Sequence, residues 1–183
     1  GVGAPNSGVE LNARMMYEAA GMTYADSKVD YLSYGEAIDQ MKNGQCDAAF
    51  VTSGLGNATI KELGTTKKIV FVPIEGEQLK KLMAKYPYYI QWKIPKETYG
   101  TDKDYTTAAV MNVMLVAKSL PDEVVYDLLK GFYSPEGLAT IGASHATAKR
   151  EIKLDTALRG IKGTKLVLHP GAIKFYKEKG IMK

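Results

Sequence analysis

The opening residues of the chain have the types and order expected of an anion-binding turn. Gly1-Val2-Gly3 has the composition of the end of a buried strand, and a turn rich in proline and glycine leads to Ser7 or Gly8, where an amphipathic helix is expected to begin. The first backbone N–H groups of a helix lack helical partners, and the helix dipole adds roughly half a positive charge there. The pattern indicates an anion site with the Ser7 hydroxyl beside it. The alternative is that Ser7 acts only as an N-cap.

The same pattern recurs along the first sixty residues. The apolar run 45–51 leads into a second polar, glycine-bearing turn at 52–57, and a helix is predicted from Ala58 to Leu63. Between these units, 29–32 is a predicted strand that ends at Ser33, an N-cap for a helix over 34–43. Strands that alternate with helices predict a parallel open sheet with crossover helices. Ligands of such sheets bind beyond the carboxyl ends of the strands, so we expect a carboxylate-binding cleft at this edge.

The sequence contains no recognisable catalytic or metal-binding constellation. Of its two histidines, His145 is expected on a helix surface or in helix packing, and His169 is expected to cap a helix or be buried. Nucleophile-elbow, phosphate-loop and dinucleotide signatures are absent, and no cluster has metal-ligand spacing. The single cysteine, Cys46, excludes an internal disulfide. We therefore expect a protein that is not an enzyme, with no cofactor and no metal.

Composition narrows the class of protein further. The chain has 183 residues, of which 45% are hydrophobic and 24% charged, with a formal net charge of +4, which is ordinary for a globular protein. The basic residues are spread out without interleaved aromatics, so no nucleic-acid partner is expected. The longest apolar stretch, 108–117, is too short to span a bilayer. Because the chain opens in what looks like the middle of a strand, we expect a fragment whose missing signal peptide says nothing about localisation.

Hydrophobic periodicity predicts the remaining elements. The run 69–74 is continuously apolar, which favours a central strand buried on both faces. The segment 88–98 is expected to be an extended, aromatic-rich connection, and 105–118 a long strand or two strands joined by a bend. The predicted helices cover 9–20, 76–85, 121–133, 134–148, 154–161 and 172–179.

Several segments, in order and over nearly the whole chain, resemble one family. The sequence is similar to TAXI-type solute receptors of TRAP transporters in the segments 3–14 (GAPNSGVELNAR), 31–37 (YLSYGEA), 43–52 (NGQCDAAFVT), 86–89 (YPYY) and 169–180 (HPGAIKFYKEKG).

The resemblance implies an α/β fold like that of type II periplasmic binding proteins, with two lobes that close on a ligand. Members are longer than this chain, so residues 1–88 would be the second α/β lobe, a parallel open sheet with crossover helices. Residues 89–183 would be the hinge return and the C-terminal strand and helices of a truncated first lobe. The missing part would expose an apolar face, and a homodimer could form through it.

The resemblance also implies a function and a set of ligand-binding residues. The receptor would be periplasmic or otherwise extracytoplasmic, would capture a small organic anion such as glutamate, glutamine or a dicarboxylate, and would deliver it to the membrane subunits of a TRAP transporter. The first turn would hold the ligand carboxylate, the second turn its other polar group, and two tyrosines the hinge side. The implied residues are Asn6, Ser7, Gly8, Val9, Glu10, Thr52, Ser53, Tyr88 and Tyr89.

Some of these roles have structural alternatives. Glu10 would also favour the helix dipole and help to cap the helix. The tyrosines could pack in the core, and Trp92 is expected to do so. Ser33 and Tyr34 are lesser ligand candidates, since Ser33 is also the expected N-cap of a helix. For the whole chain, the alternatives are a metabolite-sensing lobe of a cytoplasmic regulator or enzyme with the same fold, and an interaction surface with a degenerate cleft.

Overall fold

A computed structural model describes residues 1–144, 146–161 and 163–183, so the expected role of His145 lies outside the described residues. The chain divides into two compact units, Gly1–Ala109 and Val110–Lys183. The sequence had suggested a division after Tyr88, whereas the strands that follow Tyr88 pack with the first unit. The assignment of the units to lobes of a longer receptor stays a prediction.

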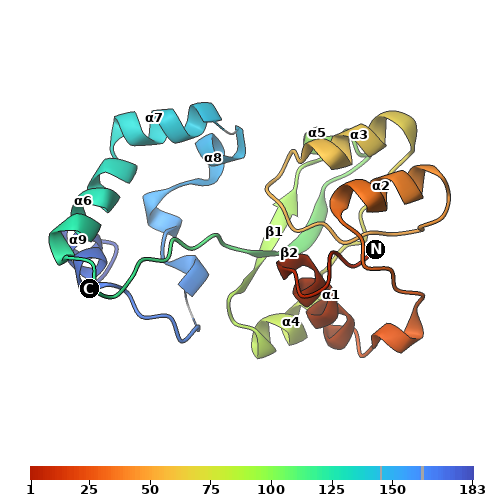
Figure 1. Ribbon diagram of the computed structural model, residues 1–183, viewed down its shortest axis with the longest axis horizontal. Helices are drawn as coiled ribbons and strands as arrows, with labels where there is room; N and C mark the ends of the chain where they lie inside the picture. The colour runs from red at the N-terminus through yellow and green to blue at the C-terminus, as the bar shows by residue number, and fades with distance from the viewer. Residues whose placement is uncertain (145, 162) are drawn as a thin grey trace. The chain divides into compact units, whose positions relative to one another are not determined.

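The first unit is built mainly of helices, with two strands near its end (Figure 1). Its elements are α1 (Gly8–Ala19), the 3-10 helix η1 (Tyr24–Asp26), α2 (Tyr34–Lys42), α3 (Ala58–Thr66), α4 (Gly76–Lys85), β1 (Tyr89–Ile94), α5 (Lys96–Tyr99) and β2 (Tyr105–Val110).

The starts of the first three α-helices follow from their capping residues. Ser7 accepts a hydrogen bond from the N–H of Glu10, and Asn57 caps α3 in the same manner. Ser33 and Glu36 form a reciprocal capping box at α2. Short polar side chains satisfy N–H groups that the helix cannot, which fixes where each helix begins. The predicted N-caps Ser7 and Ser33 are confirmed.

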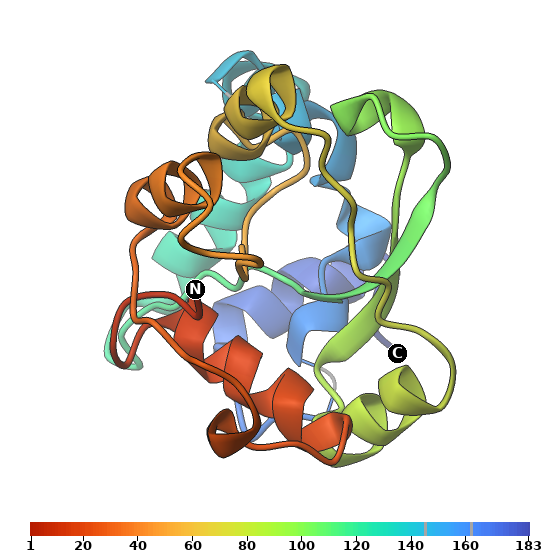
Figure 2. The same ribbon diagram turned by 90° about the vertical axis from the view of Figure 1, so that its right-hand side faces the viewer.

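Two helix pairs organise the first unit. Helix α1 packs against α4, and α2 packs against α3, as Figures 1 and 2 show. The core between α1, α4 and β1 is centred on the buried side chains of Leu79, Leu82 and Tyr89. Burial of these large side chains is the main favourable contribution to holding α1 in place.

The predicted parallel open sheet is not shown; in the described part of the chain, the sheet that is formed joins β1 and β2. The extended segments 1–3, 29–32 and 48–51 nevertheless lie side by side. Val2 N donates to Asp30 O at 3.0 Å, and Phe50 N donates to Gly1 O at 2.9 Å, so the first segment lies between the other two. Single bonds of this kind do not make up the regular ladder of bonds that defines a sheet.

The prediction that 69–74 is a central strand buried on both faces is wrong. Val70 and Val72 are 70% and 80% exposed, and the segment is not a strand. Phe71, by contrast, contacts the rings of Tyr99 and Tyr105 at centroid distances of 5.2 and 5.6 Å. Alternate residues therefore face inward and outward, and the outward face has no covering layer within the described residues.

The second unit consists of helices and extended connections, and the predicted long strand over 105–118 is limited to β2. The predicted helix over 134–148 corresponds to the helical ranges 135–144 and 146–151, and residues 154–161 contain two 3-10 helices. The elements of this unit are α6 (Asp122–Phe132), α7 (Pro135–Ser144), α8 (Ala146–Glu151), η2 (Leu154–Thr156), η3 (Arg159–Ile161) and α9 (Pro170–Glu178).

The core of the second unit lies between α6 and α9. Phe175 is fully buried there, and a β-carbon on Gly171 would lie 2.1 Å from the carbonyl oxygen of Asp122. Only glycine allows the two backbones to approach this closely. His169 caps α9 as predicted: Nδ1 accepts from Gly171 N at 3.2 Å, which leaves Nε2 to donate to Leu120 O at 3.1 Å.

Candidate ligand-binding site

The turn before α1 contains two residues with positive φ, and both are of types that tolerate this conformation. Gly3 has a φ of +94°, and a β-carbon there would lie 2.7 Å from the β-carbon of Val9. Asn6 has a φ of +59°, in the left-handed region that asparagine tolerates better than most residues. The chain reverses at Ala4, whose carbonyl accepts from Ser7 N at 3.1 Å. This turn carries the chain directly into the N-terminus of α1.

The N-terminus of α1 retains donors for a ligand. Within the described part of the chain, the N–H groups of Gly8 and Val9 donate to no protein atom. Gly8 is exposed, and a β-carbon there would meet nothing within 4 Å. The Ser7 oxygen accepts from Glu10 N at 3.2 Å, so its own proton stays available to a ligand. These groups form an open, positively polarised donor set suited to a carboxylate.

Glu10 is directed into the unit. It is 1% exposed, and its Oε1 accepts from Arg14 Nη2 at 2.6 Å and from the Tyr24 hydroxyl at 3.2 Å. The Glu10 side chain does not help to cap α1 as predicted. It instead joins α1 to η1 by its hydrogen bond with Tyr24. Its other oxygen, Oε2, is buried without a hydrogen-bond partner among the described residues.

This cluster shifts the pKa of both partners of Glu10. The hydrogen bond and the charge of Glu10 raise the pKa of Arg14. Burial, reinforced by the negative charge of Glu10, raises the pKa of Tyr24 to about 12. Tyr24 is therefore a hydrogen-bond donor at any physiological pH, and the Arg14 guanidinium lies 5.7 Å from the centre of its ring.

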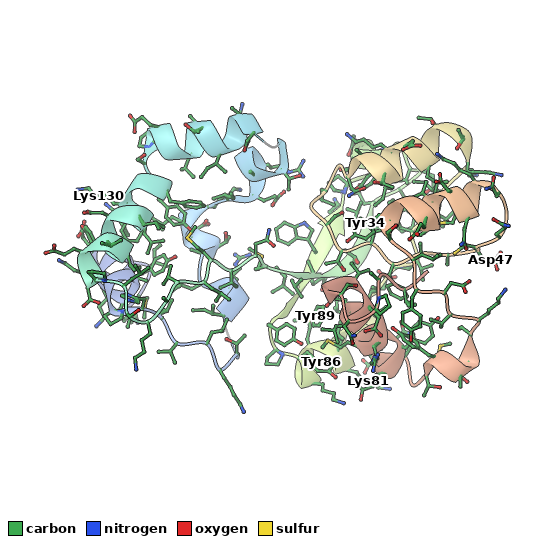
Figure 3. The ribbon with its side chains drawn as sticks, viewed as in Figure 1. Tyr34, Asp47, Lys81, Tyr86, Tyr89 and Lys130 are labelled. Atoms are coloured by element: carbon green, nitrogen blue, oxygen red, sulfur yellow. The ribbon has the colours of Figure 1, made fainter. Side chains whose placement is uncertain are left out.

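The second turn meets the first helix through Asn12. Asn12 Nδ2 donates to the Thr52 hydroxyl oxygen at 3.0 Å, and the Tyr89 hydroxyl donates to Asn12 Oδ1 at 2.5 Å. The hydroxyl of Tyr34 donates to the carbonyl of Thr52 at 2.6 Å and accepts from its N–H at 3.2 Å. Figure 3 labels Tyr34, at the start of α2, and Tyr89, which begins β1. Side chains of α1 and α2 thus converge on Thr52, which is itself exposed, and β1 is joined to it through Asn12.

The other candidates from the sequence occupy different environments. Ser53 is exposed, and its hydroxyl donates to the carbonyl of Gly54 at 3.2 Å. Tyr88 is half-buried, with its hydroxyl 3.4 Å from Met15 Sδ. Tyr89 is 2% exposed and packs in the core, so it lies beneath Asn12. The structure brings Thr52 and Tyr89 together at Asn12. Glu10 instead contacts Arg14 and Tyr24, and Tyr88 contacts Met15.

Sequence reasoning missed Asn12, Arg14 and Tyr24 as parts of this region. A signal for Asn12 was present: it lies four residues after Gly8 and three before Met15, a spacing that places all three on one helix face. Leu11, the residue before Asn12, is 46% exposed and does not belong to the packed face of α1. A polar residue between residues of the packed face is the pattern that could have indicated a buried polar contact.

A separate hollow of about 310 Å³ lies on the sheet of the first unit. Its lining comes from both strands and includes none of the implied ligand-binding residues; it comprises Gln91, Trp92, Lys93, Asp104, Tyr105 and Thr106. Lys93 and Asp104 form an ion pair there at 2.5 Å. Trp92 contributes to this hollow and is only half-buried.

Two features are absent from the described residues. No helix there is long and apolar enough to cross a membrane. No group of three or more histidine, cysteine or acidic side chains there could hold a metal ion.

Comparison with protein families gives a match over almost the whole chain. A family model described as the NMT1-like family matches residues 1–180. The match covers both compact units, and therefore includes the α1 N-terminus and the Thr52 turn.

Proposed function

Since the chain belongs to the NMT1-like family, a periplasmic binding-protein-like family, we propose that it captures a small organic anion as the receptor of a TRAP-type transporter. The family indicates a substrate-binding protein in general, and its members are often extracytoplasmic. The proposal adds an acidic amino acid or a dicarboxylate as ligand, binding without turnover, and delivery to membrane subunits. It also assigns the chain to the TAXI-type receptors with a type II periplasmic fold and an extracytoplasmic location.

The observation that carries this proposal is the open donor set at the start of α1. The N–H groups of Gly8 and Val9 and the Ser7 hydroxyl proton point to no protein acceptor among the described residues. A carboxylate has two oxygens that can accept from these groups, and the helix dipole favours its charge. Thr52, joined to the same helix by Asn12, supplies a second polar group for the ligand.

The exposed valines of segment 69–74 support a proposal about partners. Val70 and Val72 form an apolar surface that no described residue covers. Burying such a surface against a second copy of the chain would remove it from water. We therefore propose that the chain can form a homodimer through this face.

Ligand binding can be tested directly with a panel of compounds. Thermal unfolding of the full chain would be measured with acidic amino acids, dicarboxylates, sugars and cations, and each stabilising compound would be confirmed by calorimetry. A ligand at about 100 times its dissociation constant stabilises the folded state by roughly 2.7 kcal/mol. Stabilisation by carboxylates alone is the expected result. Stabilisation by sugars or cations alone would contradict the proposal.

The matched pair Ser7→Ala and Ser134→Ala separates ligand binding from helix capping. Both serines accept from the N–H three residues later, at 3.2 and 3.0 Å, but Ser134 belongs to the second unit. Both variants should lose about 1 kcal/mol of stability through the lost cap. Only Ser7→Ala should also weaken carboxylate binding, by about 1–3 kcal/mol. Equal affinity in the two variants would show that Ser7 is only a cap.

A further inference from the structure

A chain of hydrogen bonds leads from the core of the first unit to the proposed ligand site. It begins at the Tyr89 hydroxyl, passes through the two ends of the Asn12 amide, and ends at the Thr52 hydroxyl. Tyr89 is 2% exposed, whereas Thr52 is exposed. The direction in which protons are donated along this chain decides what Thr52 can offer to a ligand.

Tyr89, at the buried end of this chain of hydrogen bonds, sets the direction in which protons are donated. A phenol has one proton, and the Tyr89 hydroxyl lies 2.5 Å from Asn12 Oδ1 and 3.4 Å from Met15 Sδ. Because the amide oxygen is both nearer and the stronger acceptor, the proton is donated to Asn12 Oδ1. Burial raises the pKa of Tyr89, so the phenol keeps this proton. With Oδ1 facing Tyr89, the NH₂ end of the Asn12 amide must face Thr52, and Nδ2 donates to the hydroxyl oxygen at 3.0 Å.

The result is that Thr52 presents a donor. Its oxygen already accepts from Asn12, and within the described residues its hydroxyl proton is donated to no protein atom. The main chain of Thr52 is held as well, since the Tyr34 hydroxyl binds both its carbonyl and its N–H. These contacts hold Thr52 beside Asn12, whose Nδ2 donates to the Thr52 hydroxyl oxygen.

We propose that Asn12 and Tyr89 are positioning residues that make Thr52 a hydrogen-bond donor, so that the site selects anions whose second polar group is an acceptor. This inference rests on the proposed function. It narrows the ligand class to compounds such as dicarboxylates and oxo acids, with their carboxylate at the α1 N-terminus. An anion whose second group is an ammonium could use only the remaining lone pair of the Thr52 oxygen and would leave the Thr52 proton without an acceptor.

Two compounds test this selection in the full chain. Glutarate and 4-aminobutyrate share one carboxylate and a three-methylene chain, and differ in the second group, a carboxylate or an ammonium. The affinities of both would be measured by calorimetry for each variant. The wild-type protein is expected to bind glutarate about tenfold more tightly, because glutarate accepts the Thr52 proton whereas 4-aminobutyrate leaves that proton without an acceptor.

A pair of substitutions that change no charge isolates the role of Tyr89. Tyr89→Phe removes the donor that orients Asn12, so the amide can turn and the preference should fall to near parity. Tyr88→Phe is the matched control, because the Tyr88 hydroxyl contacts Met15 Sδ and not Asn12. It should keep the wild-type preference. Both variants keep their aromatic rings, and their folding would be checked by thermal unfolding.

A reversal experiment tests Asn12 itself. In Asn12→Asp both side-chain oxygens accept, so Thr52 must donate inward and present lone pairs to the ligand. The preference should then change to 4-aminobutyrate. The negative charge of the new aspartate by itself also favours an ammonium. Asn12→Asp is therefore also made in a protein that carries Thr52→Val, where the hydroxyl is absent and only the charge effect remains. The shift in preference should be about tenfold larger when Thr52 is present.

The outcomes separate this inference from the proposed function. If the wild-type protein binds both compounds equally, or if Tyr89→Phe keeps the wild-type preference, the inference is overturned while carboxylate binding stands. The inference is equally overturned if Asn12→Asp shifts the preference by the same factor in Thr52→Val. If the wild-type protein binds no carboxylate, the proposed function fails and the inference fails with it.

Discussion

Gly3 packs so closely on Val9 that a β-carbon on Gly3 would lie 2.7 Å from the β-carbon of Val9. The contact closes the turn that leads into α1 and leaves its first N–H groups pointing away from the protein. Gly8, only one residue before Val9, has the opposite environment, since a β-carbon there would meet nothing within 4 Å. The two glycines of this turn therefore differ in their surroundings: Gly3 allows close packing against Val9, whereas Gly8 leaves the N-terminus of α1 open to a ligand.

This contrast leads to a prediction for Gly8→Pro. Gly8 is the first residue of α1, a position that proline favours, and Ser7 has the extended backbone that must precede proline. The variant should fold with unchanged or slightly higher stability, by about 0.4–1 kcal/mol, yet lose one N–H donor from the site. We expect carboxylate affinity, measured by calorimetry, to fall by about 1–3 kcal/mol.

Gly8→Ala is the control for this change, because alanine keeps the N–H and meets no neighbouring atom. It should bind carboxylates as the wild-type protein does. If Gly8→Pro also binds normally, the N–H of Gly8 is not a ligand contact.

The second unit offers a test of close helix packing. Gly171→Ala would place a β-carbon 2.1 Å from the carbonyl oxygen of Asp122 and force α9 away from α6. We expect the free energy of unfolding to fall by about 1–3 kcal/mol, measured by chemical denaturation. Gly131→Ala, in α6 with open space around its β-carbon, should instead be neutral or stabilise by up to about 1 kcal/mol. Equal effects in the two variants would argue against the close approach.

Alkaline pH should weaken the first unit through Tyr24. The pKa of Tyr24 is about 12 in the folded protein, above the ordinary value of 10.0 that it has when unfolded. Between these values the folded state binds more protons than the unfolded state, so stability is fully present below pH 10 and is lost as the pH rises toward 12. Denaturant midpoints measured across this range should fall less steeply in Tyr24→Phe. A slope unchanged by the substitution would contradict the assignment.

The exposed face of segment 69–74 predicts self-association. Val72, which is 80% exposed, can be replaced by lysine without disturbing Phe71, whose side chain packs inward. If two copies associate through this face, Val72→Lys should weaken association, measured by sedimentation equilibrium over a range of concentrations. Val167→Lys, at a 91% exposed position of the second unit, serves as the control. An equal loss in both variants would indicate nonspecific apolar contact.

Much of the local structure of the candidate site could be predicted from the sequence. Ser7 caps α1 by accepting from a residue three positions away, and Ser33 caps α2 over the same separation. Such bonds depend only on residues within one turn, so residue type and spacing are sufficient to predict them. The start of α1, and with it the proposed carboxylate site, belongs to this class.

The hydrogen-bond partners of Glu10 could not all be predicted from residues within one helical turn. Its spacing from Ser7 predicts a reciprocal cap, but its carboxylate bonds instead to Arg14 and to Tyr24, 14 residues away. Arg14 lies one helical turn away on α1 itself, whereas Tyr24 reaches Glu10 through the packing of η1 on α1. Likewise, the apolar character of 69–74 indicated a buried strand, yet burial depends on what covers a segment, which its own residues do not specify.

The sequence by itself determined where the helices begin and which turns could bind an anion, because those features arise from interactions within a few residues. Only the tertiary structure decided that Asn12 lies between Thr52, 40 residues away, and Tyr89, 77 residues away. Contacts at such separations depend on how α1 packs against α4 and β1, which is the sum of many apolar contacts. That packing therefore sets the direction in which the Thr52 hydroxyl donates its proton.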